Sequence, residues 1–259
     1  MTCNHYGYLG EESDKENEFS IEKGQVIAGY TIGILLLDVW YPLMPGNVVN
    51  ASTYDFPVRH KLVKGATQER MHTGDPTLLD DLVEAGRELE KEGVRAIIGA
   101  CGYFGHFQPQ LADELEVPVY LSSLVQIPLI EQGLKSNQKI GILCADEENL
   151  TSELMEKCGA RDPDICVVKG LGDKPEFSAL PNSDRGEFDN GKVRDEVVTG
   201  AKNLVEEHED VGAILLECSD MPPYAADVQR AVNLPVYDFI TMINWVHNSV
   251  AQKPYYGFL

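Results

Sequence analysis

The sequence has 259 residues, of which 43% are hydrophobic, and its 21 Lys and Arg residues against 42 Asp and Glu residues give a formal net charge of −21. This acidity argues against nucleic acid or an anionic membrane surface as a partner, because binding to phosphate needs a basic face. The length suffices for one large domain or two smaller ones. The sequence has neither a membrane-length apolar run nor signal-peptide character at the N-terminus, so we expect a cytoplasmic protein.

Strands and helices are expected to alternate after a polar N-terminal tail, residues 1–24. Asp75 and Pro76 give a typical helix start, because proline is favoured in the first helical turn. A region rich in glycine and proline, 170–191, is expected to be a surface loop or flap. The expected elements in chain order are strands at 26–37 and 48–54, a helix from Asp75 to about Gly93, strands at 94–100 and 139–144, a helix at 149–158, a strand at 165–168, a helix at 197–209, strands at 211–217 and 234–237, and a helix at 239–250.

This alternation, with strands that are apolar along their whole length, predicts parallel sheets covered by helices on both faces. We expect an N-terminal α/β lobe at 25–130 and a C-terminal α/β lobe at 131–238. The last segment, 239–259, is expected to pack back on the first lobe.

One segment of the chain is repeated. Val94–Cys101 reappears as Val211–Cys218, and Pro118–Tyr120 reappears as Pro235–Tyr237, both at an offset of 117 residues. A third pair of similar segments, Ile-Gly-Ile-Leu at 32–35 and at 140–143, has an offset of 108. A repeat of this kind predicts two similar halves.

Each half places a cysteine at an equivalent position, Cys101 in the first and Cys218 in the second. Both follow a hydrophobic strand and precede a helix, at the edge of the sheet where ligands bind in α/β folds. A helix N-terminus there favours thiolate. The repeat does not select Cys144, Cys158 or Cys166, and free cysteines are commonly buried in cores, so we interpret these three as structural.

The segments around the two cysteines, Ile98–Tyr103 and Leu215–Pro222, resemble the two cysteine motifs of the aspartate/glutamate racemase superfamily. That superfamily also contains hydantoin racemases, maleate isomerases and arylmalonate decarboxylases, and the resemblance covers most of 30–250. It implies two pseudo-symmetric flavodoxin-like three-layer lobes with the active site in a cleft between them.

The resemblance further implies a cofactor-independent racemase or epimerase that acts on a carbon next to a carboxylate or imide carbonyl, in an amino acid or a hydantoin-like compound. One thiolate would take the α-proton, and the opposite thiol would return a proton to the other face. The two thiols would then titrate as a coupled pair.

The residues that follow each cysteine depart from those of the amino-acid racemases. Tyr103 replaces a small polar residue, and Asp220 replaces a histidine and would repel a second carboxylate. We therefore expect a substrate with one carboxylate or a cyclic imide, and a neutral or cationic remainder, rather than glutamate or aspartate. The candidate substrate-binding residues are Asp38, Gly102, Tyr103, Ser122, Ser123, Ser219 and Asp220.

Three other interpretations stay open at this point. A related isomerase or decarboxylase would use mainly one cysteine, a hydrolase would pair Cys101 with His106, and a non-catalytic module would only bind its ligand. The sequence indicates no cofactor and no metal site, since Cys3 and His5 are only two ligands on a tail. The expected partner is an anionic or cyclic small molecule, and association into a homo-oligomer is left open.

Overall fold

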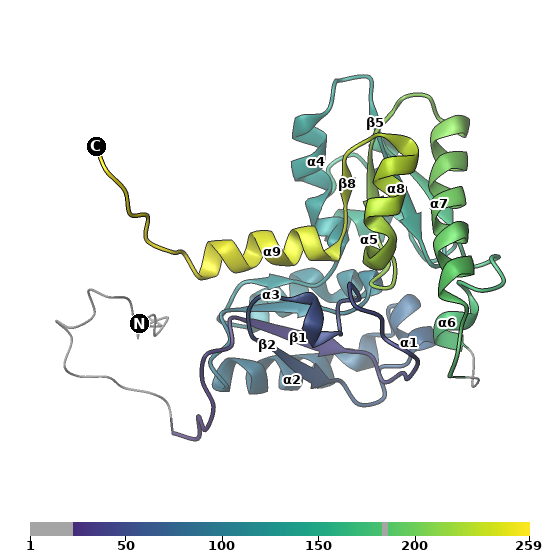
Figure 1. The fold of residues 1–259 in the computed structure, drawn as a ribbon. Coiled ribbons are helices and arrows are strands. Elements are labelled where there is room, and N and C mark those ends of the chain that lie inside the picture. The colour runs from purple at the N-terminus through teal and green to yellow at the C-terminus, as the bar shows by residue number, and fades with distance from the viewer. Residues whose placement is uncertain (1–22, 183–185) are drawn as a thin grey trace.

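The computed structural model describes residues 23–182 and 186–259, which fold into two α/β lobes (Figure 1). Each lobe is built on a four-stranded sheet in which neighbouring strands run parallel. The predicted fold class is therefore confirmed. Apart from Lys23 and Gly24, the tail predicted at 1–24 lies outside the described residues, and so does the pair Cys3 and His5.

The first sheet has the strand order β2-β1-β3-β4. The strands and α-helices of this lobe are β1 (Ile32–Leu36), β2 (Val58–Leu62), α1 (Gln68–His72), α2 (Leu79–Lys91), β3 (Ala96–Gly99), α3 (Gln108–Glu114) and β4 (Val119–Tyr120). The next helix, α4 (Ile127–Gly133), packs on the second sheet. Alternate residues of β1 face opposite sides of the sheet. Leu35 packs in one buried cluster with Leu82 of α2, whereas Ile34 packs in another with Phe239 near the C-terminus.

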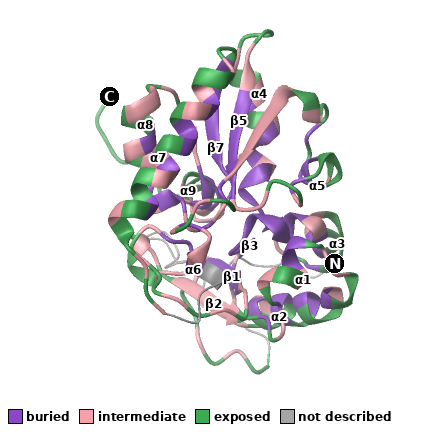
Figure 2. Ribbon diagram, turned by 90° about the vertical axis from the view of Figure 1, so that its right-hand side faces the viewer, coloured by how far each residue is buried: buried purple, intermediate pink, exposed green. Residues whose placement is uncertain are grey.

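The second sheet has the order β6-β5-β7-β8. The strands and α-helices of this part are β5 (Lys139–Cys144), α5 (Ser152–Lys157), β6 (Cys166–Gly170), α6 (Ala179–Asn182), α7 (Asn190–Glu207), β7 (Val211–Leu216), α8 (Ala225–Val232), β8 (Val236–Tyr237) and α9 (Phe239–Val250). Leu215 of β7 faces the cluster that contains Leu154 of α5, and Leu216 faces Val197 of α7. Figure 2 shows β5 and β7 buried at the centre of this lobe.

The strand pairing repeats the offset found in the sequence. Ile97 of β3 pairs with Val119, and Ile214 of β7 pairs with Val236, so both partners are shifted by 117 residues. Ile32 pairs with Ala96 and Ile140 with Ala213, shifted by 108 and 117 residues. The two halves therefore share register as well as sequence, and equivalent positions in them have equivalent surroundings.

Helix α9 leaves the second sheet and packs on the first. Its Phe239, Met242 and Ile243 are fully buried in one cluster with Ile34 and Ile98. The aromatic end of the C-terminal segment, 255–259, is exposed.

The prediction of a strand at 48–54 is wrong. This segment contains a short 3₁₀-helix, Ala51–Thr53, because the Asn50 side chain accepts the Ser52 N–H and caps a turn. The second strand is instead β2, which is only partly buried and carries Arg59 in an ion pair with Glu92.

The region predicted as a loop at 170–191 contains α6 and the beginning of α7. Phe177 is buried there in the core of the second lobe. Helix α7 begins at Asn190, seven residues before the predicted start, because Asp189 accepts the N–H groups of Gly191 and Lys192. No helix within 23–182 or 186–259 is long and apolar enough to cross a membrane.

Candidate active site

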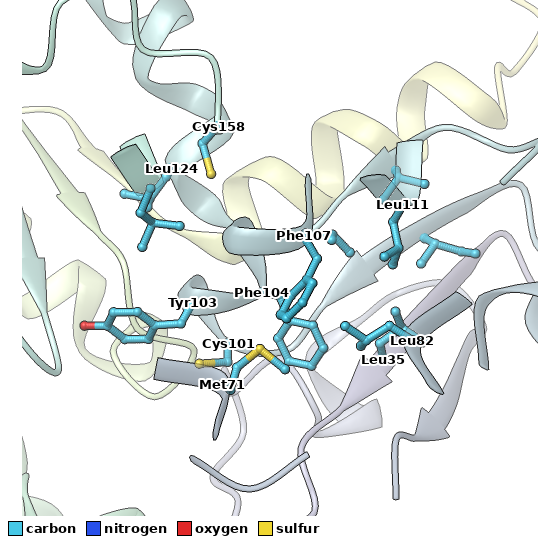
Figure 3. Packing of buried hydrophobic residues seen from close by; sticks show 14 of the residues in the cluster. Leu35, Met71, Leu82, Cys101, Tyr103, Phe104, Phe107, Leu111, Leu124 and Cys158 are labelled. Carbon is cyan, nitrogen blue, oxygen red and sulfur yellow. The ribbon is translucent and has the colours of Figure 1, made fainter. Parts of the chain in front are cut away.

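Cys101 lies between β3 and the 3₁₀-helix Gly102–Phe107, for which it is the N-terminal cap. Its side chain is buried, and Figure 3 shows its sulfur pointing away from Leu82 and Leu111 of the core. Burial raises the pKa of this thiol well above its ordinary value, and the backbone N–H of Tyr103 partly offsets the rise. At neutral pH Cys101 is therefore a thiol.

Cys218 occupies the matching position after β7 and is half-buried. Burial raises the pKa of Cys218 as well, and the backbone N–H of Asp220 lowers it, as the Tyr103 N–H does at Cys101. A charge on Cys101 raises the pKa of Cys218 further. The two thiols thus lie close enough to interact, and each has an N–H donor two residues further along the chain.

Asp220 joins the two lobes beside Cys218. Its carboxylate accepts a hydrogen bond from the Tyr41 hydroxyl at 3.0 Å and another from the Asn47 side chain, both on the loop that follows β1. One carboxylate oxygen lies 3.8 Å from the Cys218 sulfur. Burial raises the pKa of Asp220 to about 6, so the group is ionised at neutral pH. Asp220 therefore places a negative charge next to one of the two thiols.

Glu217 directly precedes Cys218 and is fully buried. Neither of its carboxyl oxygens has a hydrogen-bond partner among the described residues. Gly102 leaves the space for this carboxyl, because a Cβ atom at 102 would lie 1.8 Å from Glu217 Oε1. The glycine after Cys101 therefore accommodates a glutamate side chain of the other lobe.

Tyr103 is buried and packs toward the second lobe. Its hydroxyl donates to the Asp146 carbonyl oxygen at 2.6 Å and accepts from the Asp146 N–H at 2.9 Å. Its ring lies against His72, which contacts the Asp146 carboxylate at 3.2 Å. These contacts connect the segment after Cys101 to the end of β5.

The other predicted substrate contacts have different surroundings. Ser122 caps the 3₁₀-helix Ser123–Gln126, and the Ser123 hydroxyl donates to the Leu216 carbonyl oxygen at 3.1 Å. Ser219 is buried next to Cys218. Asp38 is exposed and accepts the N–H of Gly65, which lies in the turn after β2, at 2.9 Å. The hydroxyls of Ser122 and Ser123 therefore both form hydrogen bonds with backbone groups.

His106, the candidate partner of Cys101 in a hydrolase, contacts the His72 carbonyl oxygen through its ring at 3.2 Å. It is not among the groups that shift the pKa of Cys101. A cleft of about 770 Å³ opens nearby and is lined by His72, Asp146 and Phe177, among others, but by neither Cys101 nor Cys218. Among the residues that the structure describes, no group of three or more His, Cys, Asp or Glu side chains is arranged to hold a metal ion.

The groups that interact with the two thiols are acids. Glu217 and Asp220 raise the pKa of Cys101 and of Cys218, and both thiols raise the pKa of Tyr41. Lys, Arg and His are not among the causes of either thiol's shift. The arrangement can exchange protons with a bound molecule, and its charge favours a cation beside Asp220.

Tyr41, Asn47 and Glu217 are the site residues that the sequence analysis missed. Tyr41 and Asn47 lie in a loop whose proline and glycine residues predict an irregular segment but do not indicate that it contacts Asp220 of the other lobe. Glu217 carried a usable signal, because an acidic residue at the end of a continuously apolar strand is rarely buried without a purpose.

Comparisons with known proteins agree on the fold and add a reaction. The chain is 34% identical over 240 residues to dimethylsulfoniopropionate lyase 6 of Emiliania huxleyi (strain CCMP1516), covering 88% of this chain and 61% of that protein. It is 31% identical to the dimethylsulfoniopropionate lyase of Durusdinium sp. clade D, covering 88% of this chain and 77% of that protein. The chain thus spans about three fifths of the Emiliania lyase's length. No family model matches the sequence.

The similar solved structures belong to the superfamily expected from the cysteine motifs. The allantoin racemase of Klebsiella pneumoniae has a TM-score of 0.58 at 16% identity, over 85% of this chain and 88% of its own. The glutamate racemase of Bacillus anthracis has a TM-score of 0.54 at 14% sequence identity, and the match covers 86% of this chain and 85% of that protein. An arylmalonate decarboxylase has a TM-score of 0.54 at 16% sequence identity, and the match covers 87% of this chain and 94% of that protein. These likenesses confirm the superfamily fold and leave the reaction open.

Proposed function

Because the chain belongs to the dimethylsulfoniopropionate lyase family, we propose that it is a lyase that splits this sulfonium compound into dimethyl sulfide and acrylate. The observation that carries the proposal is the 31% identity that extends over 77% of the Durusdinium lyase. The relatives are lyases, so the racemase or epimerase expected from the cysteine motifs is not supported at the level of the reaction. Both reactions begin with the removal of a proton next to a carboxylate.

In the proposed mechanism a thiolate removes the α-proton. Cys101 is the candidate base, and its N–H donor at Tyr103 favours the thiolate. The electron pair of the broken C–H bond forms the carbon–carbon double bond, and the C–S bond breaks as its electron pair leaves with dimethyl sulfide. The proton stays on the Cys101 sulfur and then passes to solvent, so protons and electrons balance.

The charges of the site suit the charges of this substrate. Dimethylsulfoniopropionate carries one carboxylate and one positively charged sulfur, so it falls within the class expected from the sequence, one carboxylate or a cyclic imide with a neutral or cationic remainder. The ionised Asp220 would lie beside the sulfonium group, and the Tyr41 and Asn47 hydrogen bonds hold that carboxylate in place. Cys218 lies beside this charge, and we propose that it faces the substrate from the second lobe.

The proposal is tested by incubating the purified chain with dimethylsulfoniopropionate and measuring dimethyl sulfide in the headspace and acrylate in solution. Equal amounts of both products are expected. A parallel assay supplies aspartate, glutamate and a substituted hydantoin as single enantiomers in deuterated water. Racemisation with α-deuterium uptake there, together with the absence of dimethyl sulfide, would replace the lyase by an isomerase.

A further inference from the structure

We propose that Glu217 controls when Cys101 can ionise: the two residues share one negative charge, so the thiolate forms while the carboxyl is protonated and is suppressed once the carboxyl ionises. Glu217 is thus a positioning residue that acts through the thiol. The inference rests on the proposed function only in taking Cys101 as the base.

The first support is the burial of the carboxyl. Glu217 has no exposed surface, and neither oxygen has a hydrogen-bond partner among the described residues. The strand end is fixed, because Ser123 donates a hydrogen bond to the Glu217 carbonyl oxygen at 3.3 Å. An ionised carboxylate that is buried without partners is very costly, so the neutral acid is the favoured form.

The second support is how closely the carboxyl approaches the segment of Cys101. Oε1 lies 1.8 Å from where a Cβ atom of residue 102 would be, so the carboxyl rests against the backbone of Gly102. At that range a charge on Glu217 acts on Cys101 through protein and not through water, where it is screened least.

The third support is that no positively charged residue of the described chain is among the groups that shift the pKa of Cys101 or Glu217. Burial raises the pKa of Glu217 to about 8. The nearby backbone N–H of Ala145 partly offsets this rise, although its geometry is not that of a hydrogen bond. A negative charge on Asp146 raises the pKa of Glu217. A negative charge on Glu217 in turn raises the pKa of Tyr103 and of the neighbouring cysteine thiols. The titratable groups that interact with Glu217 are Cys101, Tyr103, Cys144, Asp146, Cys158 and Cys218.

The test measures the reaction of Cys101 with iodoacetamide between pH 6 and 10 in the full chain without substrate, following the Cys101 peptide by mass spectrometry. In the wild type the rate should rise with pH up to about 8 and then flatten. In Glu217→Gln it should keep rising and be about tenfold faster than the wild type at pH 9, one unit above the carboxyl pKa. Glu206→Gln, an exposed residue of α7, should follow the wild type.

Matching profiles for the wild type and Glu217→Gln, or slower alkylation in the variant, would overturn the inference. A second measurement needs no variant. Infrared spectra of the wild type should show a protonated carboxyl at pH 7 that disappears as the pH rises through 8, and its absence at pH 7 would also overturn the inference. Failure to release dimethyl sulfide would end the proposed function and leave both of these results unchanged.

Discussion

In the proposed function, Asp220 connects the charge of the site to the choice of substrate. Its carboxylate has two hydrogen-bond donors from the first lobe and lies beside the Cys218 sulfur. Because its pKa is raised to about 6, it loses its charge within a pH range in which many enzymes still work. Recognition of a cation at this position should therefore depend on pH.

We expect KM for dimethylsulfoniopropionate to rise as the pH falls through 6, because protonation of Asp220 removes the charge that we propose to lie opposite the sulfonium. Asp220→Asn should raise KM about fivefold at neutral pH, the equivalent of roughly 1 kcal/mol, and abolish this pH dependence. Steady-state kinetics between pH 5 and 8 measure both effects, with the exposed Asp210→Asn as control. An unchanged KM in Asp220→Asn would remove Asp220 from substrate recognition.

The two thiols should differ from the other cysteines in their effect on activity. Cys101→Ser should lower kcat by at least about a hundredfold, since a serine hydroxyl is a far weaker base, and Cys218→Ser should lower it as well. Cys166→Ser, at a half-buried thiol outside the site, should retain nearly full activity. Dimethyl sulfide release measures all three. If Cys218→Ser kept full activity, the reaction would use one cysteine.

Glu217 should make stability depend on pH. Its pKa in the folded chain, about 8, lies above its ordinary value of 4.5, so the folded state binds more protons than the unfolded state between these values. The free energy of unfolding should therefore fall as the pH rises from about 4.5 to 8 and change no further through this group above 8. Glu217→Gln should be more stable than the wild type by about 2–4 kcal/mol at pH 8 and equally stable at pH 4.5. Urea denaturation at the two pH values tests this, and an equal difference at both would contradict it.

At the scale of elements, α9 shows how one helix ties the halves together. Its N-terminal cap is Asp238, whose side chain accepts the Thr241 N–H while the Thr241 hydroxyl accepts the Asp238 N–H. Gln126 of the first lobe donates to the Asp238 carbonyl oxygen at 2.9 Å. The cap is therefore shared between the helix and the lobe on which it packs.

Loss of this cap should destabilise the whole chain. Asp238→Ala removes a buried side chain that satisfies a helix N-terminus, and the free energy of unfolding should fall by about 1–2 kcal/mol. The exposed Asp210→Asn is the matched control in the same urea titration. A loss confined to the α9 signal, with the rest unfolding as before, would show that the helix is not coupled to the lobes.

Elements with a strong internal pattern were predictable, and those set by distant contacts were not. β5 and α9 have the predicted bounds, since an apolar run fixes the first and a helical apolar period with an Asp cap fixes the second. β2 was missed because Arg59, His60 and Lys61 give an edge strand no apolar signature. Cys101 and Cys218 could be selected through the repeat, whereas the role of Tyr103 depends on Asp146, a residue of the other lobe.

At the scale of the whole molecule, the net charge of −21 acts together with the acidic site. A chain of this charge attracts cations over distances of the order of the Debye length, so a cationic group should be drawn toward it. A zwitterion has no net charge, so this attraction is weaker for it, but the electric field of the chain should still orient its sulfonium end.

We therefore expect salt to weaken an inhibitor that carries only the cation. The inhibition constant of trimethylsulfonium should rise several-fold between about 10 and 300 mM NaCl, because salt screens the field. KM for dimethylsulfoniopropionate should change less over the same range. Inhibition assays at constant pH make the comparison, and equal salt dependence for both would show that the field of the whole chain plays no part.

The close fit between Gly102 and Glu217 also constrains how this site could have changed during evolution. Since a Cβ atom at 102 would lie 1.8 Å from the carboxyl, an alanine there is incompatible with this glutamate conformation. A lineage could gain a side chain beside the first cysteine only after the residue before the second had become smaller, and the two substitutions would be accepted in one order but not the other. In an alignment of relatives, positions 102 and 217 should accordingly vary together.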